Sequence, residues 1–162
     1  MITVPEQRLS PNFTLHELIR SETAARRGID NTPAQEIIEN LRHLAAFLQL
    51  VKALLGGGAI LISSAFRCLL LNVAAGGAQK PLSYHTQGLA ADFTCPSFGT
   101  PYEVARALAA SDLPYDKVIY EFGDWVHVQI AKPGEIPRRE TYTIFSAAEG
   151  YLPGIREHRR AA

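Results

Sequence analysis

The sequence predicts an α+β fold, in which helices pack on a small, largely antiparallel sheet. Helix signals dominate the first half of the 162-residue chain, and the clearest β-hairpin signal lies in the second half. The hydrophobic fraction of 47% is ordinary for a globular domain of this length, which excludes a disordered or collagen-like chain. We expect one domain over residues 1–146 and a polar C-terminal tail over residues 147–162.

The helix signals come in order along the first half of the chain, after an irregular lead-in. Thr14 and Glu17 form a capping box, which predicts a short helix. Thr32 as N-cap and Pro33 at the first helical position mark a stronger helix start. Apolar residues then recur at steps of three and four as far as residue 55, and a glycine run begins at residue 56. This spacing predicts a long amphipathic helix.

Shorter elements follow the glycine run. We expect strands over residues 59–63, 89–94 and 140–145, and helices over residues 67–75 and 102–110. The two cysteines, Cys68 and Cys95, fit no metal-ligand or redox spacing. We expect both to be reduced thiols, with a disulfide as the alternative.

The hairpin signal consists of β-type runs at residues 117–122 and 125–130. Two residues join these runs, which is the spacing of a tight two-residue turn. Such a turn fixes the register and opposes Tyr120 to His127. Both side chains then share a face with Trp125, while aliphatic residues line the other face.

The charge balance and the hydropathy pattern exclude some classes of partner. The chain has 16 basic and 16 acidic residues, and zero net charge argues against a nucleic-acid partner. The most apolar region, residues 45–62, is interrupted by polar residues and glycines, so we expect no stable membrane insertion. The first residues lack the pattern of a signal peptide, so we expect synthesis in the cytoplasm without one.

One polar segment brings an imidazole and a carboxylate close together. His85 and Asp92 are seven residues apart, and Gly88 and small residues between them keep the backbone close to both groups. Together with His127 they make two histidines and one aspartate, a set suited to a catalytic zinc ion with one position open for water. From the residues alone, a hydrogen-bonded structural His–Asp pair is the alternative.

Two motifs in this region resemble those of a known family. They are S-x-H-x-x-G-x-A-x-D at residues 83–92 and D-x-x-H at residues 124–127. The sequence resembles the zinc-dependent peptidoglycan peptidases, which include D-alanyl-D-alanine carboxypeptidases and dipeptidases and the L-alanyl-D-glutamate endopeptidases of phage endolysins. Their fold is shared with the signalling domain of hedgehog proteins. Stretches at residues 13–18, 62–67 and 121–128 also resemble the short single-domain branch.

The resemblance implies a zinc peptidase domain whose Zn²⁺ ligands are His85, Asp92 and His127. It implies Asp124 as the general base that takes a proton from water. Glu121 is the competing candidate, and the predicted hairpin register turns it toward the aliphatic face.

The resemblance also implies residues that contact the substrate. Arg67 lies where the family has an arginine that reaches a substrate carbonyl or carboxylate; a surface arginine is the alternative. Ser83 either contacts substrate or shapes the loop before His85. The hairpin register, rather than the resemblance, puts Tyr120 and Trp125 on the His127 face, where they either line the cleft or only pack in the hairpin.

The function implied is hydrolysis of amide bonds in peptidoglycan stem peptides, by a cell-wall lytic endopeptidase or a D,D-carboxypeptidase encoded by a phage or prophage. We expect a monomer that reaches the cell wall after holin-type release, on a virion or by other export. A non-catalytic zinc-containing binding module on the same fold is the alternative, and an acid at residue 124 favours the enzyme. A nucleic-acid or membrane binder would depend only on the basic cluster at residues 156–160.

Overall fold

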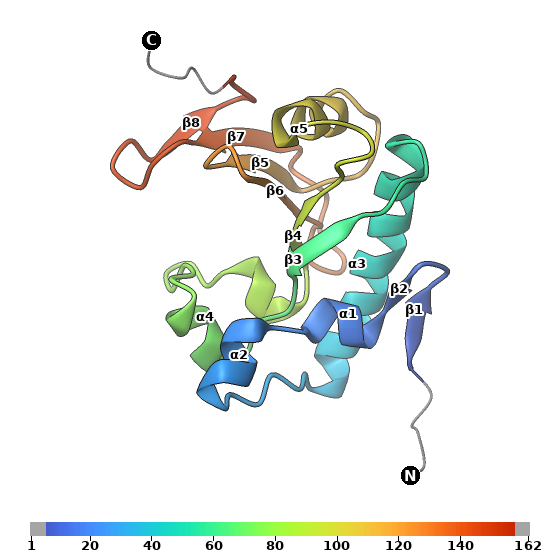
Figure 1. Cartoon of the computed structure of the whole chain (residues 1–162), viewed down its shortest axis with the longest axis vertical. Coiled ribbons are helices and arrows are strands. Elements are labelled where there is room, and N and C mark those ends of the chain that lie inside the picture. The colour runs from blue at the N-terminus through green and yellow to red at the C-terminus, as the bar shows by residue number, and fades with distance from the viewer. Residues whose placement is uncertain (1–5, 158–162) are drawn as a thin grey trace.

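The computed structural model describes residues 6–157 and contains helices packed against a mostly antiparallel sheet (Figure 1). Its helices are α1 (Leu15–Ile19), α2 (Glu22–Arg27), α3 (Gln35–Leu54), α4 (Leu69–Ala74), the 3₁₀ helix η1 (Tyr84–Gln87) and α5 (Pro101–Ala109). Its strands are β1 (Arg8–Ser10), β2 (Phe13–Thr14), β3 (Leu61–Ser64), β4 (Ala90–Thr94), β5 (Lys117–Glu121), β6 (Trp125–Gln129), β7 (Glu140–Ile144) and β8 (Tyr151–Pro153). The predicted α+β class is confirmed. Within residues 6–157, no helix has both the length and the apolar character needed to span a bilayer.

The N-terminal region differs from the prediction in detail. The predicted lead-in contains the β1–β2 hairpin, and the single helix predicted after it is two helices. The backbone adopts an extended conformation at Arg20, which ends α1. The Ser21 hydroxyl then accepts a hydrogen bond from the Ala24 N–H and caps the start of α2. Helix α3 begins at Gln35, later than predicted, because the Asp30 carboxylate accepts from the Thr32 N–H and holds this stretch in a turn.

The main sheet has the strand order β3-β4-β6-β5-β7-β8. All neighbouring strands are antiparallel except β5 and β7, which are parallel. Helix α5 packs on β5 and β6, and the part of the apolar stripe of α3 between Leu41 and Val51 is buried in the same core. Cys68 and Cys95 are free thiols, as expected.

The turn between β5 and β6 has three residues, not the two predicted. Phe122 (φ 55°) and Gly123 (φ 72°) both adopt left-handed backbone conformations. The Asp124 N–H donates to the Glu121 carbonyl at 3.0 Å, and Glu121 then pairs with Trp125 across the hairpin. The extra turn residue shifts the pairing of β5 by one position.

This shift reverses the two faces of β5, since side chains alternate along a strand. Ile119, rather than Tyr120, lies opposite His127. The predicted placement of Tyr120 is therefore wrong: its side chain is buried in the core. Glu121 moves from the expected aliphatic face to the face that carries His127.

The sheet also continues beyond residue 146, where the predicted domain ends. Strand β8 pairs with β7 and adds the last strand at the edge of the sheet. The Thr143 hydroxyl donates to the Gly154 carbonyl at 2.8 Å and ties this segment to β7. Residues 147–157 thus belong to the fold rather than to a polar tail. Residues 158–162 of the predicted tail lie outside the described residues.

Candidate metal centre

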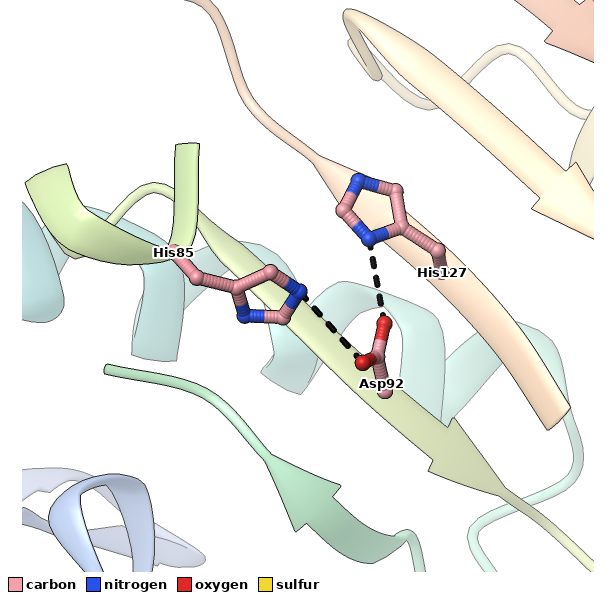
Figure 2. A group of neighbouring side chains, drawn as sticks. All are labelled: His85, Asp92 and His127. Atoms are coloured by element: carbon pink, nitrogen blue, oxygen red, sulfur yellow. Dashed lines mark hydrogen bonds and ion pairs between the residues drawn. The ribbon is translucent and has the colours of Figure 1, made fainter. Parts of the chain in front are cut away.

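The three predicted metal ligands lie together in the structure (Figure 2). His85 Nε2 is 3.4 Å from Asp92 Oδ2, and His127 Nδ1 is 3.0 Å from Asp92 Oδ1. One ligand atom from each residue lies within 4.8 Å of the other two, and all three side chains are buried. The Asp92 carboxylate therefore lies between two imidazole rings, whose nitrogens point toward it.

Strand pairing brings two of these side chains together. Asp92 on β4 and His127 on β6 are direct cross-strand partners, so their side chains project from the same face of the sheet. His85 comes from η1, which the Ser83 hydroxyl caps by accepting from the His85 N–H. Ser83 thus shapes the loop before His85.

Gly88 fixes where η1 lies against α3. Its φ of +70° is left-handed, and a Cβ atom there would lie 3.0 Å from Ile37 Cγ2 and 3.1 Å from the Ile37 carbonyl oxygen. Only glycine meets both requirements without strain. The glycine of the first sequence motif therefore lets η1 pack closely on α3 and directs His85 toward β4.

Hydrogen bonds orient both imidazole rings. The Ala65 carbonyl can only accept, so His85 Nδ1 carries the hydrogen and donates to it at 2.7 Å. His85 Nε2 then presents its lone pair to the site. In His127, Nε2 lies 3.0 Å from Gln129 Oε1, and Nδ1 is the nitrogen that faces Asp92.

Burial and mutual charge shift the pKa values of the group. Burial raises the pKa of Asp92, but the two imidazoles outweigh it and hold that pKa well below its usual range. Burial lowers the pKa of His85, with Asp92 opposing the shift. Burial also lowers the pKa of His127, but its hydrogen bond to Asp92 and the nearby carboxylates raise it above the ordinary value. An ionised carboxylate and a neutral His85 are the forms that bind a metal, and a metal would displace a proton from His127.

Glu121 lies beside this group. Its Oε1 is 3.9 Å from His127 Nδ1, and its Oε2 accepts a hydrogen bond from Trp125 Nε1 at 3.1 Å. Burial raises the pKa of Glu121 to about 7, with the charge of Asp92 adding to the shift and His127 opposing it. A carboxyl group with this pKa is suited to accept and return a proton near neutral pH.

The structure does not bring Asp124 to the group. Its side chain is exposed in the turn, and within residues 6–157 it makes no hydrogen bond or ion pair with the ligand residues. Its role as base stays a prediction. Trp125 is partly buried on the His127 face, whereas Tyr120 packs in the core against Tyr102, with ring centroids 5.8 Å apart.

Arg67 is held at the site by its backbone, since its N–H donates to the His85 carbonyl at 3.1 Å. Its Nε is buried and has no hydrogen-bond partner among the described residues. Burial lowers the pKa of the guanidinium, and the charges of Asp92 and Glu121 oppose this shift. A buried donor without a partner is rare in folded proteins, and it suits a group that receives an acceptor from a ligand.

Two residues near the site have no role in the sequence analysis. Gln129 shares the His127 face of β6, because side chains alternate along a strand, but periodicity alone does not identify its contact with His127. Tyr151 on β8 pairs with Ile144, which pairs with Glu121, so the Tyr151 side chain projects from the face of the sheet that carries the site. A strand of three residues is too short for alternation to reveal it.

In an α+β fold, a buried group of two histidines and one carboxylate, next to a further acid and an arginine, has the residue types of a metal-dependent hydrolase site. The sequence model of the Peptidase M15 family matches residues 11–129, which is most of the chain and includes all three residues of the group. The chain belongs to this family, whose members are zinc-dependent metallopeptidases. A comparison with curated proteins finds no match.

Proposed function

We propose that this protein is a zinc peptidase that hydrolyses amide bonds in the stem peptides of peptidoglycan. The observation that carries the proposal is the buried group of His85, Asp92 and His127 with the Glu121 carboxyl beside it. The family match supports the peptidase activity.

The donor set fits zinc. Two imidazole nitrogens and one carboxylate oxygen are the ligands of catalytic zinc sites, which keep a further position open. Each imidazole already has its other nitrogen in a hydrogen bond, His85 to Ala65 and His127 to Gln129, as metal-bound histidines do. Zinc in such a site supplies Lewis-acid chemistry and lowers the pKa of bound water to about 7.

Glu121 is proposed as the proton acceptor in place of Asp124. Its carboxylate lies on the same face as the ligands and next to His127, whereas Asp124 is exposed. Glu121 would take the proton of the attacking water and return it to the leaving amine. The Trp125 indole holds the carboxylate in place by donating to Oε2.

Arg67 is proposed to bind the substrate oxygen. Its buried Nε lacks a partner, and the guanidinium can donate to a peptide carbonyl as negative charge develops there. It can equally bind a terminal carboxylate, so the site suits an endopeptidase or a D,D-carboxypeptidase.

The resemblance to the short single-domain branch supports a phage or prophage origin, with a monomer delivered to the wall after holin-type release, on a virion or by export. Co-expression with a holin tests the first route, because the protein would then lyse its host and would not lyse it alone.

Purified peptidoglycan digested with and without a chelator tests the function. We expect zinc-dependent release of muropeptides, and mass spectrometry of these products identifies the scissile bond. Bound zinc with no new products at any pH would contradict the peptidase proposal and favour a zinc-containing binding module. Absence of stoichiometric zinc after reconstitution would contradict the metal site itself.

A further inference from the structure

A continuous chain of hydrogen bonds leads from His127 to the protein surface. His127 Nε2 meets Gln129 Oε1 at 3.0 Å, and Gln129 Nε2 donates to Asp116 Oδ2 at 2.9 Å. Arg138 closes the chain by donating from Nη2 to Asp116 Oδ2 at 2.7 Å and from Nε to Oδ1 at 3.1 Å. Gln129 and Asp116 are 5% and 2% exposed, so water does not compete for these bonds.

The chemistry of these groups gives the chain one direction. A carboxylate only accepts, so the side of the Gln129 amide that faces Asp116 must be its NH₂ group. The amide oxygen is then left for His127, and an amide oxygen also only accepts. His127 Nε2 must therefore carry a hydrogen. The Asp92 carboxylate also only accepts, so in the metal-free protein His127 Nδ1 carries the hydrogen of its bond to Asp92, and this is the proton that a metal would displace.

Asp116 is fixed in its ionised form. Burial raises the pKa of its carboxyl group, but the hydrogen bonds from Arg138 and Gln129 outweigh burial and lower that pKa to about 2. The Arg138 N–H also donates to Oδ1 at 3.0 Å, and the Asp116 N–H donates to the Gln129 carbonyl at 2.8 Å. The carboxylate thus has little freedom to turn away from Gln129.

We propose that Gln129, Asp116 and Arg138 are positioning residues, which hold His127 in the one tautomer and ring orientation that presents Nδ1 to the metal. This inference rests on the metal site proposed above. It adds that the affinity of the site for zinc depends on a chain of hydrogen bonds that ends at Arg138, a half-exposed arginine on the segment before β7. Partners of this kind typically change metal affinity by about 10- to 100-fold when removed.

Gln129→Met is the first test, because methionine keeps the length of the side chain and removes the acceptor. We expect zinc affinity, measured by competition with a chromogenic chelator, to fall by about 10- to 100-fold. In the metal-free wild-type protein, ¹H–¹⁵N NMR of labelled histidine should show the Nε2 hydrogen of His127 protected from exchange with water. In Gln129→Met, which has no acceptor for this hydrogen, it should exchange faster.

Thr143→Val is the matched control, since Thr143 is fully buried on β7 and its hydroxyl bonds to Gly154. It removes two hydrogen bonds elsewhere in the sheet, to the Gly154 carbonyl and from the Arg156 N–H, and should leave zinc affinity and exchange of the His127 Nε2 hydrogen unchanged.

Unchanged zinc affinity and unchanged exchange of the His127 Nε2 hydrogen in Gln129→Met would overturn the inference. Equal losses in Gln129→Met and Thr143→Val would also overturn it, because the effect would then be general destabilisation. If Gln129→Met does not fold, Arg138→Met at the surface end replaces it. We then expect a smaller loss of zinc affinity, and an unchanged affinity would refute the role of the chain. Wild-type protein that binds no zinc would refute the metal site, whereas exchange of the His127 Nε2 hydrogen in the metal-free protein still tests the positioning chain.

Discussion

Glu121→Gln separates the two acids that compete for the role of base. Glutamine has the same shape, and its amide oxygen can still accept from Trp125 Nε1, so the fold and the zinc ligands stay in place. The substitution removes only the ability to take up a proton 3.9 Å from His127 Nδ1. A general base contributes about 10²- to 10⁴-fold to the rate, or about 3–5 kcal/mol of transition-state stabilisation.

We therefore expect kcat to fall by about 10²- to 10⁴-fold in Glu121→Gln, with zinc content unchanged. Asp124→Asn is the matched control, because it makes the same chemical change at an exposed position in the same hairpin. It should digest peptidoglycan at close to the wild-type rate. Muropeptide release measures activity, and metal analysis with thermal unfolding confirms that both variants are loaded and folded. A larger loss in Asp124→Asn than in Glu121→Gln would refute the reasoning and restore the base implied by the sequence motif.

Three further predictions follow from the same geometry. In the metal-free protein, the native state holds the Glu121 proton more tightly than the unfolded chain does, so the free energy of unfolding should fall as pH rises from about 4.5 to about 7. Denaturant titrations should therefore show Glu121→Gln to be more stable than the wild type at pH 8, by up to about 3 kcal/mol in the free energy of unfolding, and equally stable at pH 4. The same difference at both pH values would contradict this prediction. Gly88→Ala should destabilise the fold by roughly 1–3 kcal/mol in the same titrations, because the new Cβ meets Ile37 at 3.0 Å in a left-handed backbone; wild-type stability would refute that account. Arg67→Met should lower kcat/KM by about 10²-fold or more without changing zinc content, and loss of zinc instead would show that Arg67 supports the ligands rather than the substrate.

The three residues of the metal group could be predicted from the sequence because all of them lie within two short motifs. The first motif spans a single turn and the strand after it, so local chain geometry already brings His85 near Asp92. Its glycine has a structural reason that spacing alone does not reveal, namely the close packing of η1 on Ile37. His127 meets Asp92 through a long-range strand pairing, and it could be predicted as a ligand only because the second motif contains it.

The position of Glu121 could not be predicted, because it depends on one residue in a turn. Two-residue and three-residue turns fit the same β-type runs. In the structure Phe122 adopts a left-handed conformation and belongs to the turn, which therefore has three residues. A slip of one residue moves every side chain of β5 to the other face. The sequence therefore predicted His127 on the correct face of β6 while placing Glu121 on the wrong face of β5.

The remaining differences come from elements that are too short to show a period. The break at Arg20 and the strand β8 each involve only a few residues, and tertiary contacts rather than local propensity determine them. Residues 147–157 are largely polar and show no strand pattern, but residues 151–153 form a strand by pairing with the free edge of β7.

That edge strand has a consequence for the behaviour of the protein at high concentration. An exposed strand edge is a template on which a second chain can add by backbone pairing, and it is a common origin of aggregation. Here the outermost strand has only three residues and ends in Pro153, which has no N–H to offer. The sheet is thereby closed to extension by another molecule on this side, and a variant that replaces Pro153 by a β-branched residue should increase self-association without any change at the metal centre.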